Sequence, residues 1–373
     1  MNTSGRAALR VIVAGGGTGG HLYPGIAVAR ELLRREPDAQ VSFAGTARGL
    51  EARVIPREGL ALDLIRSGGL KGKSIGARLR GLALLPASAI DAARLLARRR
   101  PHLVVGVGGY SSGPVVLLAA LRGIPTLLLE QNAVPGLTNR LLARVVDAAA
   151  VTYDSSLPYF GAKGFVSGNP VRAGFFAQED GHAHDERPGQ PARVLILGGS
   201  QGAHAINLAV VAAAPRLAAA GPSLALTHQT GAADLELVRE GVGRAGLVAR
   251  VEPFLHDMER EMGSADLVVS RAGATTLAEI TAAGRPSILV PLPTATDDHQ
   301  RKNAEVLQQA GAAELLPQRE MTGKVLADRV LALAADPARR RRMGRAAAGL
   351  ARPDAARLIA DRAIALAAGR RER

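Results

Sequence analysis

A histidine that follows a glycine-rich loop is the strongest candidate for chemistry in this sequence. Residues 11–14 are apolar, as in a buried strand; five glycines and Thr18 fall within positions 15–20, and His21 comes next. Glycine lets the backbone turn sharply and approach a bound group closely, while the amides that open the following helix attract an anion. The ordinary pKa of histidine, about 6.5, suits a general base near neutral pH. We predict that His21 accepts a proton, with a purely positioning role as the alternative.

A second loop of the same kind follows the apolar residues 194–197. It reads Gly198-Gly199-Ser200-Gln201-Gly202-Ala203-His204, which echoes the first loop. The amides of Gly199, Ser200 and Gln201 at a helix start would suit a diphosphate. The alternative is a turn that only packs a helix against a sheet. Two such loops in one chain favour binding.

Hydroxyl and carboxyl groups lie near the start of a further predicted helix, after an apolar strand at 266–270. The sequence there is Gly273-Ala274-Thr275-Thr276-Leu277-Ala278-Glu279. We expect the helix to begin near Leu277, so that Glu279 can accept both hydroxyls of a ribose; the alternative is a glutamate that only complements the helix dipole. The segment 297–300, Asp-Asp-His-Gln, is expected to hydrogen-bond a sugar rather than bind a divalent metal, because adjacent carboxylates point apart in an extended loop.

Apolar segments alternate with helical patterns along the whole chain, which is typical of parallel sheets covered on both faces. The predicted strands lie at 11–15, 41–45, 62–65, 103–109, 126–130 and 148–151, and again at 194–198, 224–229, 248–251, 266–270 and 287–291. We therefore predict an α/β fold with two related Rossmann-like domains, residues 1–172 and 193–351, joined by a polar linker at 173–192. A ligand would lie at the carboxyl ends of the strands, in a cleft between the domains.

The composition excludes several kinds of site. The 373 residues include no cysteine, so disulfides, thiolate catalysis and cysteine-ligated zinc are excluded. His182 and His184 lie in the polar linker, where we expect no metal site. The net charge of +14 fits phosphorylated substrates, an anionic membrane surface, nucleic acid, or only the base composition of the genome. No signal peptide and no run of ~20 apolar residues occur, so we expect a cytosolic or peripheral membrane protein.

Several motifs together resemble those of glycosyltransferase family 28, and in particular the MurG family, which forms lipid II in bacteria. They are GGGTGGH at 15–21, GVGGYSSGP at 106–114, EQNAVPGLTNR at 130–140, GNPVR at 168–172, LGGSQGAH at 197–204, SRAGATTLAEI at 270–280 and DDHQRKNA at 297–304. The resemblance spans essentially the whole chain and implies two domains of the glycosyltransferase-B fold. It also implies that the last helix, in residues 352–373, packs back on the first domain.

The reaction that the resemblance implies is the inverting transfer of N-acetylglucosamine from UDP-N-acetylglucosamine to the 4-hydroxyl of the N-acetylmuramoyl group of lipid I. The first domain would hold the acceptor and the second the donor.

The resemblance also implies roles for individual residues. His21 would be the base, and the donor would contact Thr18, Gly19, Gly20, Asn132, Arg172, Ser200, Leu255, Ala274 to Glu279 and Gln300, with Gly199, Gln201 and His299 as further candidates. Leu255 would act through its backbone, beside the uracil. No cofactor and no nucleic acid are implied. A metal ion is dispensable, because the helix dipole behind Ser200, helped by Arg172, would steady the leaving diphosphate.

The polyprenyl tail of such an acceptor requires contact with a bilayer. Residues 75–100 have a helical pattern, in which the apolar residues Ile75, Leu79, Leu82 and Leu85 are flanked by Lys71, Lys73, Arg78 and Arg80. Apolar side chains can enter the headgroup layer, and basic residues near anionic lipid contribute about 1 kcal/mol each. The resemblance thus favours a peripheral enzyme on the cytoplasmic face of the cell membrane. The alternative is an ordinary amphipathic helix buried on the sheet.

Three other functions compete with this one. A UDP-N-acetylglucosamine 2-epimerase of the same fold would need no lipid acceptor. A non-catalytic nucleotide-sugar sensor or membrane scaffold would not depend on His21. A nicotinamide-dependent dehydrogenase is disfavoured, because it would place an acidic residue at the end of the second strand, and residues 41–45 contain none.

Overall fold

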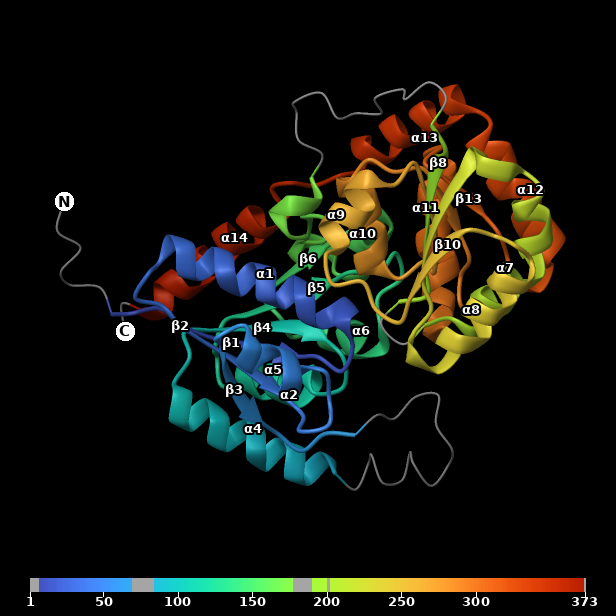
Figure 1. Ribbon diagram of the computed structural model, residues 1–373. Coiled ribbons are helices and arrows are strands. Elements are labelled where there is room, and N and C mark those ends of the chain that lie inside the picture. The colour runs from blue at the N-terminus through green and yellow to red at the C-terminus, as the bar shows by residue number, and fades with distance from the viewer. Residues whose placement is uncertain (1–6, 69–83, 177–189, 200–201, 372–373) are drawn as a thin grey trace. The chain divides into compact units, whose positions relative to one another are not determined.

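A computed structural model describes residues 7–68, 84–176, 190–199 and 202–371 (Figure 1). The chain divides into two compact units. The first contains Met1–Val171 and Asp354–Arg373, and the second contains Arg172–Pro353. The carboxyl end of the chain therefore belongs to the same unit as the amino end.

The first unit is built on a seven-stranded parallel sheet with the order β3-β2-β1-β4-β5-β6-β7. Its strands are β1 (Arg10–Gly15), β2 (Gln40–Gly45), β3 (Ala61–Leu64), β4 (Leu103–Gly108), β5 (Thr126–Glu130), β6 (Ala148–Val151) and β7 (Gly164–Val166). Its helices are α1 (Gly19–Arg35), α2 (Glu51–Arg57), α4 (Leu85–Arg99), α5 (Ser112–Leu121), α6 (Leu137–Leu142) and α14 (Ala355–Arg371), with 3-10 turns η1 (Asp154–Tyr159) and η2 (Gly161–Lys163).

The central strands of this sheet are apolar throughout because helices cover both of their faces. Successive residues of a strand point to opposite faces, so Val11 and Ile12 of β1 belong to two different core clusters. The cluster around Val11 also contains residues of α1 and α14, such as Leu22 and Ile359. The cluster around Ile12 contains residues of α4 and α5.

Helix α14 packs against α1 within the first unit. Arg35 at the end of α1 makes an ion pair with Asp361 of α14 at 2.6 Å, and the Arg370 guanidinium donates to the carbonyl of Gly123 at 2.6 Å. Ile359 and Ala363 are completely or almost completely buried there. The helix is therefore an integral part of the core of the first unit.

The second unit repeats the same plan with a six-stranded parallel sheet in the order β10-β9-β8-β11-β12-β13. Its strands are β8 (Ala192–Leu197), β9 (Leu224–Gln229), β10 (Ala249–Glu252), β11 (Leu267–Ser270), β12 (Ser287–Leu289) and β13 (Ala313–Leu315). Its helices are α7 (His204–Ala218), α8 (Leu235–Arg244), α9 (Met258–Ser264), α10 (Ala274–Ala282), α11 (His299–Gln309), α12 (Gly323–Ala334) and α13 (Pro337–Gly349). The 3-10 turns are η3 (Ala173–Phe175), η4 (Gly221–Ser223), η5 (Ala232–Asp234), η6 (Thr296–Asp298) and η7 (Gln318–Glu320).

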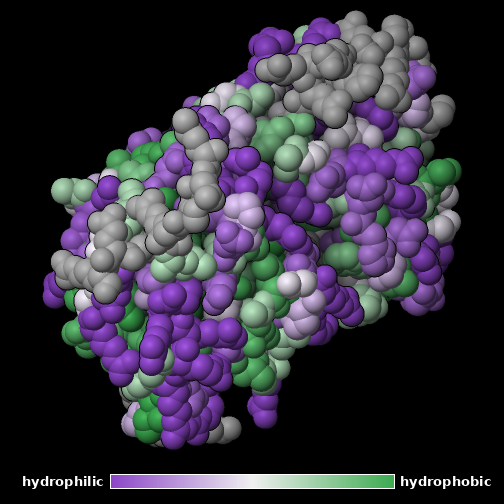
Figure 2. Space-filling view, turned by 90° about the vertical axis from the view of Figure 1, so that its left-hand side faces the viewer, coloured by the Kyte–Doolittle hydropathy of each residue, from purple (hydrophilic) through white to green (hydrophobic). Residues whose placement is uncertain are grey.

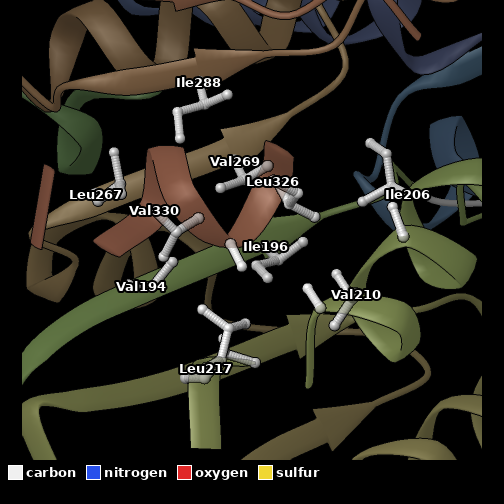
Figure 3. Packing of buried hydrophobic residues seen from close by; sticks show 14 of the residues in the cluster. Val194, Ile196, Ile206, Val210, Leu217, Leu267, Val269, Ile288, Leu326 and Val330 are labelled. Carbon is white, nitrogen blue, oxygen red and sulfur yellow. The ribbon is translucent and has the colours of Figure 1, made fainter. Parts of the chain in front are cut away.

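Branched aliphatic side chains form the core on one face of this second sheet. Figure 3 shows Val194 and Ile196 of β8 among side chains that come from β11, α7 and α12. Ile196 is fully buried, so its replacement by alanine should cost about 2–5 kcal/mol of stability, as for other large-to-small changes in a core. This packing keeps β8 in the centre of the sheet and fixes the place where its carboxyl end emerges.

Two helix boundaries differ from those expected from the sequence. Helix α4 begins at Leu85, with Pro86 in its first turn. The sequence predicted one helical segment over residues 75–100. Ile75, Leu79 and Leu82 lie outside the described residues. Helix α10 begins at Ala274, three residues before the predicted start at Leu277, because Gly273 has the extended backbone of an N-cap.

Polar and charged side chains predominate on the face of the molecule drawn in Figure 2, where hydrophobic residues form small, separate areas. In the described part of the chain, no helix combines the length and the apolar character that crossing a membrane requires.

Candidate active site

The first glycine loop lies where the order of the first sheet reverses, between β1 and β4. Ligands of doubly wound sheets bind at such a point, beyond the carboxyl ends of the strands. Gly15 has a φ of +138°, and a Cβ there would lie 2.3 Å from the carbonyl oxygen of Gly108. Only glycine fits this position, because the backbones at the ends of β1 and β4 approach so closely.

A buried carboxylate accepts a hydrogen bond from the backbone of this loop. Glu51, at the start of α2, is 1% exposed. It accepts hydrogen bonds from the amide of Gly17 at 2.7 Å and from the amide and hydroxyl of Thr46 at 2.8 and 2.9 Å. A Cβ at Gly16 would lie 2.6 Å from the same carboxylate. Glu51 thus determines the path of the loop that leads to His21.

His21 lies in the first turn of α1, with its ring against the backbone of β4. A Cβ on Gly108 would lie 2.9 Å from Nδ1 of His21, and the φ of +94° at Gly108 also requires glycine. Nδ1 is 3.1 Å from Oε1 of Gln131. The side chain is partly exposed, so the imidazole is held on one side and accessible on another.

The other predicted residues of the first unit lie at the same edge of the sheet. Thr18 is the exposed N-cap residue of α1, and Gly19 and Gly20 form its first turn. Asn132 follows β5, and its amide and side chain donate to Glu130 at 3.0 and 3.2 Å. The structure therefore places Thr18, Gly19, Gly20, His21 and Asn132 at the same carboxyl edge of the sheet, after β1 and β5, which both pair with β4.

The second glycine loop lies at the corresponding point of the second sheet, between β8 and β11. Gly199 and Gly202 have φ values of +78° and +79°, and a Cβ on Gly202 would lie 2.0 Å from the carbonyl oxygen of Thr230. The loop leads into α7. Ser200 and Gln201, both predicted to bind the donor, lie outside the described residues.

One buried amide side chain connects this loop to the segment that carries Leu255. Gln229, at the end of β9, is 3% exposed. Its Nε2 donates to the carbonyl of Gly199 at 3.0 Å, and its Oε1 accepts from the amide of Leu255 at 2.9 Å. The amide of Leu255 is thus engaged within the protein, so a backbone contact of Leu255 with a uracil would use its carbonyl group.

The amino end of α10 lies beside this loop because β11, which precedes it, pairs with β8. The amides of Ala274, Thr275 and Thr276 begin the helix, where backbone donors have no intrahelical acceptor. The side chains of Ala274 and Leu277 are buried, so these two residues and their neighbour Ala278 would meet a ligand through the backbone or the small side chain.

Glu279 is partly buried in the second turn of α10. Burial raises its pKa to about 7, while the positive charge of Arg172 acts in the opposite direction. The Arg172 guanidinium makes an ion pair with Glu259 at 3.1 Å and lies over the ring of Phe175 at 5.1 Å. A carboxyl with this pKa is easily converted to the ionised form by a ligand that donates hydrogen bonds to it.

The loop before α11 holds the last predicted residues. Gln300 Oε1 accepts from the amide of Leu292 at 2.9 Å, while Nδ1 of His299 faces the carbonyl of Thr296. Asp297 and Asp298 have left-handed backbone conformations, with φ of 53° and 56°. Among the residues that the structure describes, no group of three or more potential ligands could hold a metal ion.

Sequence reasoning missed the three buried side chains that hold these loops, namely Glu51, Gln131 and Gln229. Gln131 and Gln229 each come directly after or at the end of a buried strand, and a polar side chain at such a position signals a structural hydrogen bond. Glu51 gave no such signal, because its loop partners lie 34 and 5 residues away.

Comparison with known proteins identifies the class and then the family. Two parallel α/β units of this kind, each with a glycine loop at its topological switch point, are the glycosyltransferase-B fold. Residues 11–151 match the glycosyltransferase family 28 N-terminal domain, and residues 193–359 match the C-terminal domain of the same family. The chain belongs to glycosyltransferase family 28, which confirms the fold class and the family predicted from the motifs.

Individual relatives agree with this assignment. The chain is 50% identical over 358 residues to the UDP-N-acetylglucosamine–N-acetylmuramyl-(pentapeptide) pyrophosphoryl-undecaprenol N-acetylglucosamine transferase of Anaeromyxobacter sp. (strain K), covering 95% of this chain and 92% of that protein. The crystal structure of Acinetobacter baumannii MurG is similar with a TM-score of 0.77 and 32% identity, covering 95% and 99% of the two chains. A putative UDP-N-acetylglucosamine 2-epimerase from Listeria monocytogenes shares the fold alone, with a TM-score of 0.64 and 16% identity over 94% of each chain.

Proposed function

We propose that this chain transfers N-acetylglucosamine from UDP-N-acetylglucosamine to the 4-hydroxyl of the N-acetylmuramoyl group of lipid I, and so makes lipid II for peptidoglycan synthesis. The observation that carries the proposal is the imidazole of His21, held against Gly108 at the carboxyl edge of the first sheet, in a chain 50% identical to a transferase of that name. The transferred group and both substrates follow from that relative's name.

The donor is assigned to the second unit. The amides at the start of α7 and those at the start of α10 would bind the diphosphate with the positive ends of two helix dipoles, together with Gly199 and the predicted residue Ser200. The carbonyl of Leu255 would accept from the uracil ring, and Glu279 would accept from the ribose hydroxyls. Gln300, His299 and Arg172 are the remaining side chains that could reach the sugar or the phosphates.

The chemistry is a single in-line displacement at the anomeric carbon, which inverts its configuration. His21 removes the proton of the acceptor hydroxyl as the new C–O bond forms, and the bond to UDP breaks with its electron pair going to the diphosphate. General base catalysis of this kind contributes about 10²–10⁴-fold. Thr18, Gly19, Gly20 and Asn132 lie close to His21 at the same edge, where they would contact the transferring sugar.

Substitution of His21 tests this assignment. His21→Ala should lower kcat by about 10²–10⁴-fold, the loss expected for a missing general base, and leave the dissociation constant of UDP unchanged, because UDP binds to the second unit. The assay measures transfer of labelled N-acetylglucosamine to a lipid I analogue, and calorimetry measures UDP binding. Undiminished kcat in His21→Ala would overturn the base assignment, whereas a wild type that binds UDP but transfers no sugar would favour a sensor or scaffold.

We also propose that the first unit contacts the membrane surface through α4, α5 and α6. Leu85 of α4 is 44% exposed, and the large apolar residues Leu121 and Leu141 of α5 and α6 are 71% and 69% exposed. Helix α5 packs against both α4 and α6, and Arg122 and Arg144 beside them are exposed. Such a combination of apolar and basic side chains favours an anionic interface.

Vesicle sedimentation tests the membrane proposal. The double variant Leu121→Ser, Leu141→Ser should bind anionic vesicles several-fold more weakly while retaining its activity on a short-chain, soluble lipid I analogue. Leu237→Ser, which changes an exposed leucine of the second unit, is the matched control and should bind as the wild type does. Equal binding by all three proteins would place the membrane contact elsewhere.

An epimerase reaction can be separated from transfer by product analysis. With UDP-N-acetylglucosamine alone, the proposed transferase should give no UDP-N-acetylmannosamine, whereas an epimerase would form it without a lipid acceptor. The 16% identity to an epimerase structure supports only a common fold.

A further inference from the structure

The side chain of Gln131 is oriented by a backbone carbonyl. Its Nε2 donates to the carbonyl oxygen of Val107 at 3.2 Å. A carbonyl oxygen can only accept, so the NH₂ group of the amide must face Val107 and the oxygen Oε1 must face the other way. Gln131 is 2% exposed, so water does not compete for this orientation.

The amide oxygen then meets the imidazole of His21. Oε1 of Gln131 lies 3.1 Å from Nδ1 of His21. Because an amide oxygen donates no proton, the hydrogen bond exists only if Nδ1 carries the hydrogen. In the neutral imidazole the lone pair then lies on Nε2, the nitrogen on the far side of the ring. The orientation of Gln131 and the tautomer of His21 are therefore linked through one chain of hydrogen bonds from Val107 to His21.

The surrounding backbone disfavours a rotated side-chain amide of Gln131. Gly108 lies so close to the imidazole that a Cβ on it would be 2.9 Å from Nδ1 and 3.0 Å from Cε1 of His21. A rotation of Gln131 that turned its NH₂ toward His21 would bring two oxygens together at Val107, and would leave that carbonyl without its donor. Leaving a buried carbonyl unsatisfied is unfavourable, so this arrangement favours the Nδ1–H tautomer of His21.

We propose that Gln131 is a positioning residue that holds neutral His21 in the Nδ1–H tautomer, so that Nε2 is the atom that takes the acceptor proton. This inference rests on the proposed base function of His21 and adds the atom and the residue that selects it. Gln131 performs for His21 the role that a carboxylate performs in hydrolase triads, where the wrong tautomer lowers kcat by about 10⁴-fold. A neutral amide sets the tautomer without adding a charge beside the imidazole.

Nitrogen NMR of the protein labelled with ¹⁵N-histidine tests the tautomer directly. The signal of His21 among the eight histidines is assigned by its absence in His21→Gln. At pH 8 we expect protonated Nδ1 and unprotonated Nε2 in the wild type. Gln131→Leu should give a mixture of tautomers or the Nε2–H form. Gln229→Leu removes a similarly bridging amide of the second unit and is the matched control, with the His21 signal unchanged.

Kinetic measurements also distinguish a positioning role of Gln131 from a purely structural role, which would not produce the following changes. Gln131→Leu should lower kcat by roughly 10–100-fold, with the KM for UDP-N-acetylglucosamine unchanged. Gln131→Glu, which can still accept from Nδ1, should keep more activity and move the acid limb of the kcat profile about one unit to higher pH, because a carboxylate stabilises the imidazolium.

The two proposals fail in different ways. Protonated Nε2 in the wild type, or a tautomer unaffected by Gln131→Leu, would overturn the role of Gln131 even if His21 is essential. The expected tautomer together with an active His21→Ala would instead overturn the base function and leave the hydrogen-bond chain intact.

Discussion

The two glycine loops have the same place in their sheets but are supported by different chemical groups. In the first unit the loop rests on the carboxylate of Glu51, which accepts from Gly17 and Thr46. In the second unit the loop is held by the neutral amide of Gln229, which donates to Gly199 and accepts from Leu255. Under the proposed function the second loop attracts a diphosphate, and a neutral support suits that task, since a buried negative charge behind the loop would oppose binding. The first loop, which is proposed to present a base to an alcohol, has no such restriction.

Replacement of Glu51, which holds the first loop, should have the largest effect on the protein. Glu51→Ala leaves three backbone and side-chain donors without their acceptor and opens space beneath Gly16, so we expect the loop and His21 to shift. A misplacement of about 1 Å can cost 10²-fold in rate, and we expect kcat to fall by about 10²–10³-fold. UDP affinity should stay constant, which calorimetry can check. A parallel loss of UDP binding would contradict the separation of tasks between the two loops.

Glu279 makes the second unit sensitive to pH. Its pKa is raised to about 7 from an ordinary 4.5 when unfolded, so the folded protein binds this proton more tightly. The contribution of Glu279 to the free energy of unfolding is therefore fully present below pH 4.5 and is lost as the pH rises from 4.5 through 7. The loss reaches about 3 kcal/mol at pH 8.

The variant Glu279→Gln isolates this effect. It should be more stable than the wild type at pH 8 and equally stable near pH 4.5, in denaturant titrations of the ligand-free protein. It should also bind UDP about 10-fold more weakly, because an amide offers only one accepting oxygen to the ribose. If wild type and variant keep the same difference in stability at both pH values, Glu279 does not titrate near neutrality.

A charge placed behind the second loop tests the comparison most directly. Gln229→Glu should weaken UDP binding by about 100-fold, because a carboxylate near the diphosphate repels it and cannot donate to Gly199. Gln229→Met, a neutral variant of similar size, should weaken binding by about 10-fold, as expected for lost hydrogen bonds. Equal affinities of the two variants would show that charge behind this loop does not matter.

His228 should give the smallest effect. It is fully buried in β9, next to Gln229, and burial lowers its pKa to about 4. Neither ring nitrogen has a hydrogen-bond partner among the described residues. The pKa of histidine in the unfolded chain is about 6.5. His228 therefore does not lower the free energy of unfolding above pH 6.5, and lowers it as the pH falls toward 4.

Between pH 7.5 and 5.5 the loss from His228 should be about 1 kcal/mol. His228→Leu should remove that part of the acid sensitivity in thermal unfolding. An unchanged slope of stability against pH in the variant would mean that His228 does not contribute to it.

Much of the architecture could be predicted from the sequence because it depends on local patterns. Apolar runs such as Val194 to Leu197 predict buried parallel strands, and a glycine-rich run after each first strand predicts the sharp turn that leads into a helix. Both signals are confined to about ten consecutive residues. The family assignment followed for the same reason, since the motifs that carry it are short and continuous.

The tertiary structure alone decided how the site is held together. The early start of α10 at Ala274 depends on the extended backbone of Gly273, and the contacts of Glu51, Gln131 and Gln229 span up to 110 residues of sequence. Hydrogen bonds depend on distance and direction in space, and a linear pattern contains neither. The residue types at the site were therefore determined by the sequence, while the contact of His21 with Gln131, the engaged amide of Leu255 and the raised pKa of Glu279 arise only after strands far apart in the chain pair side by side.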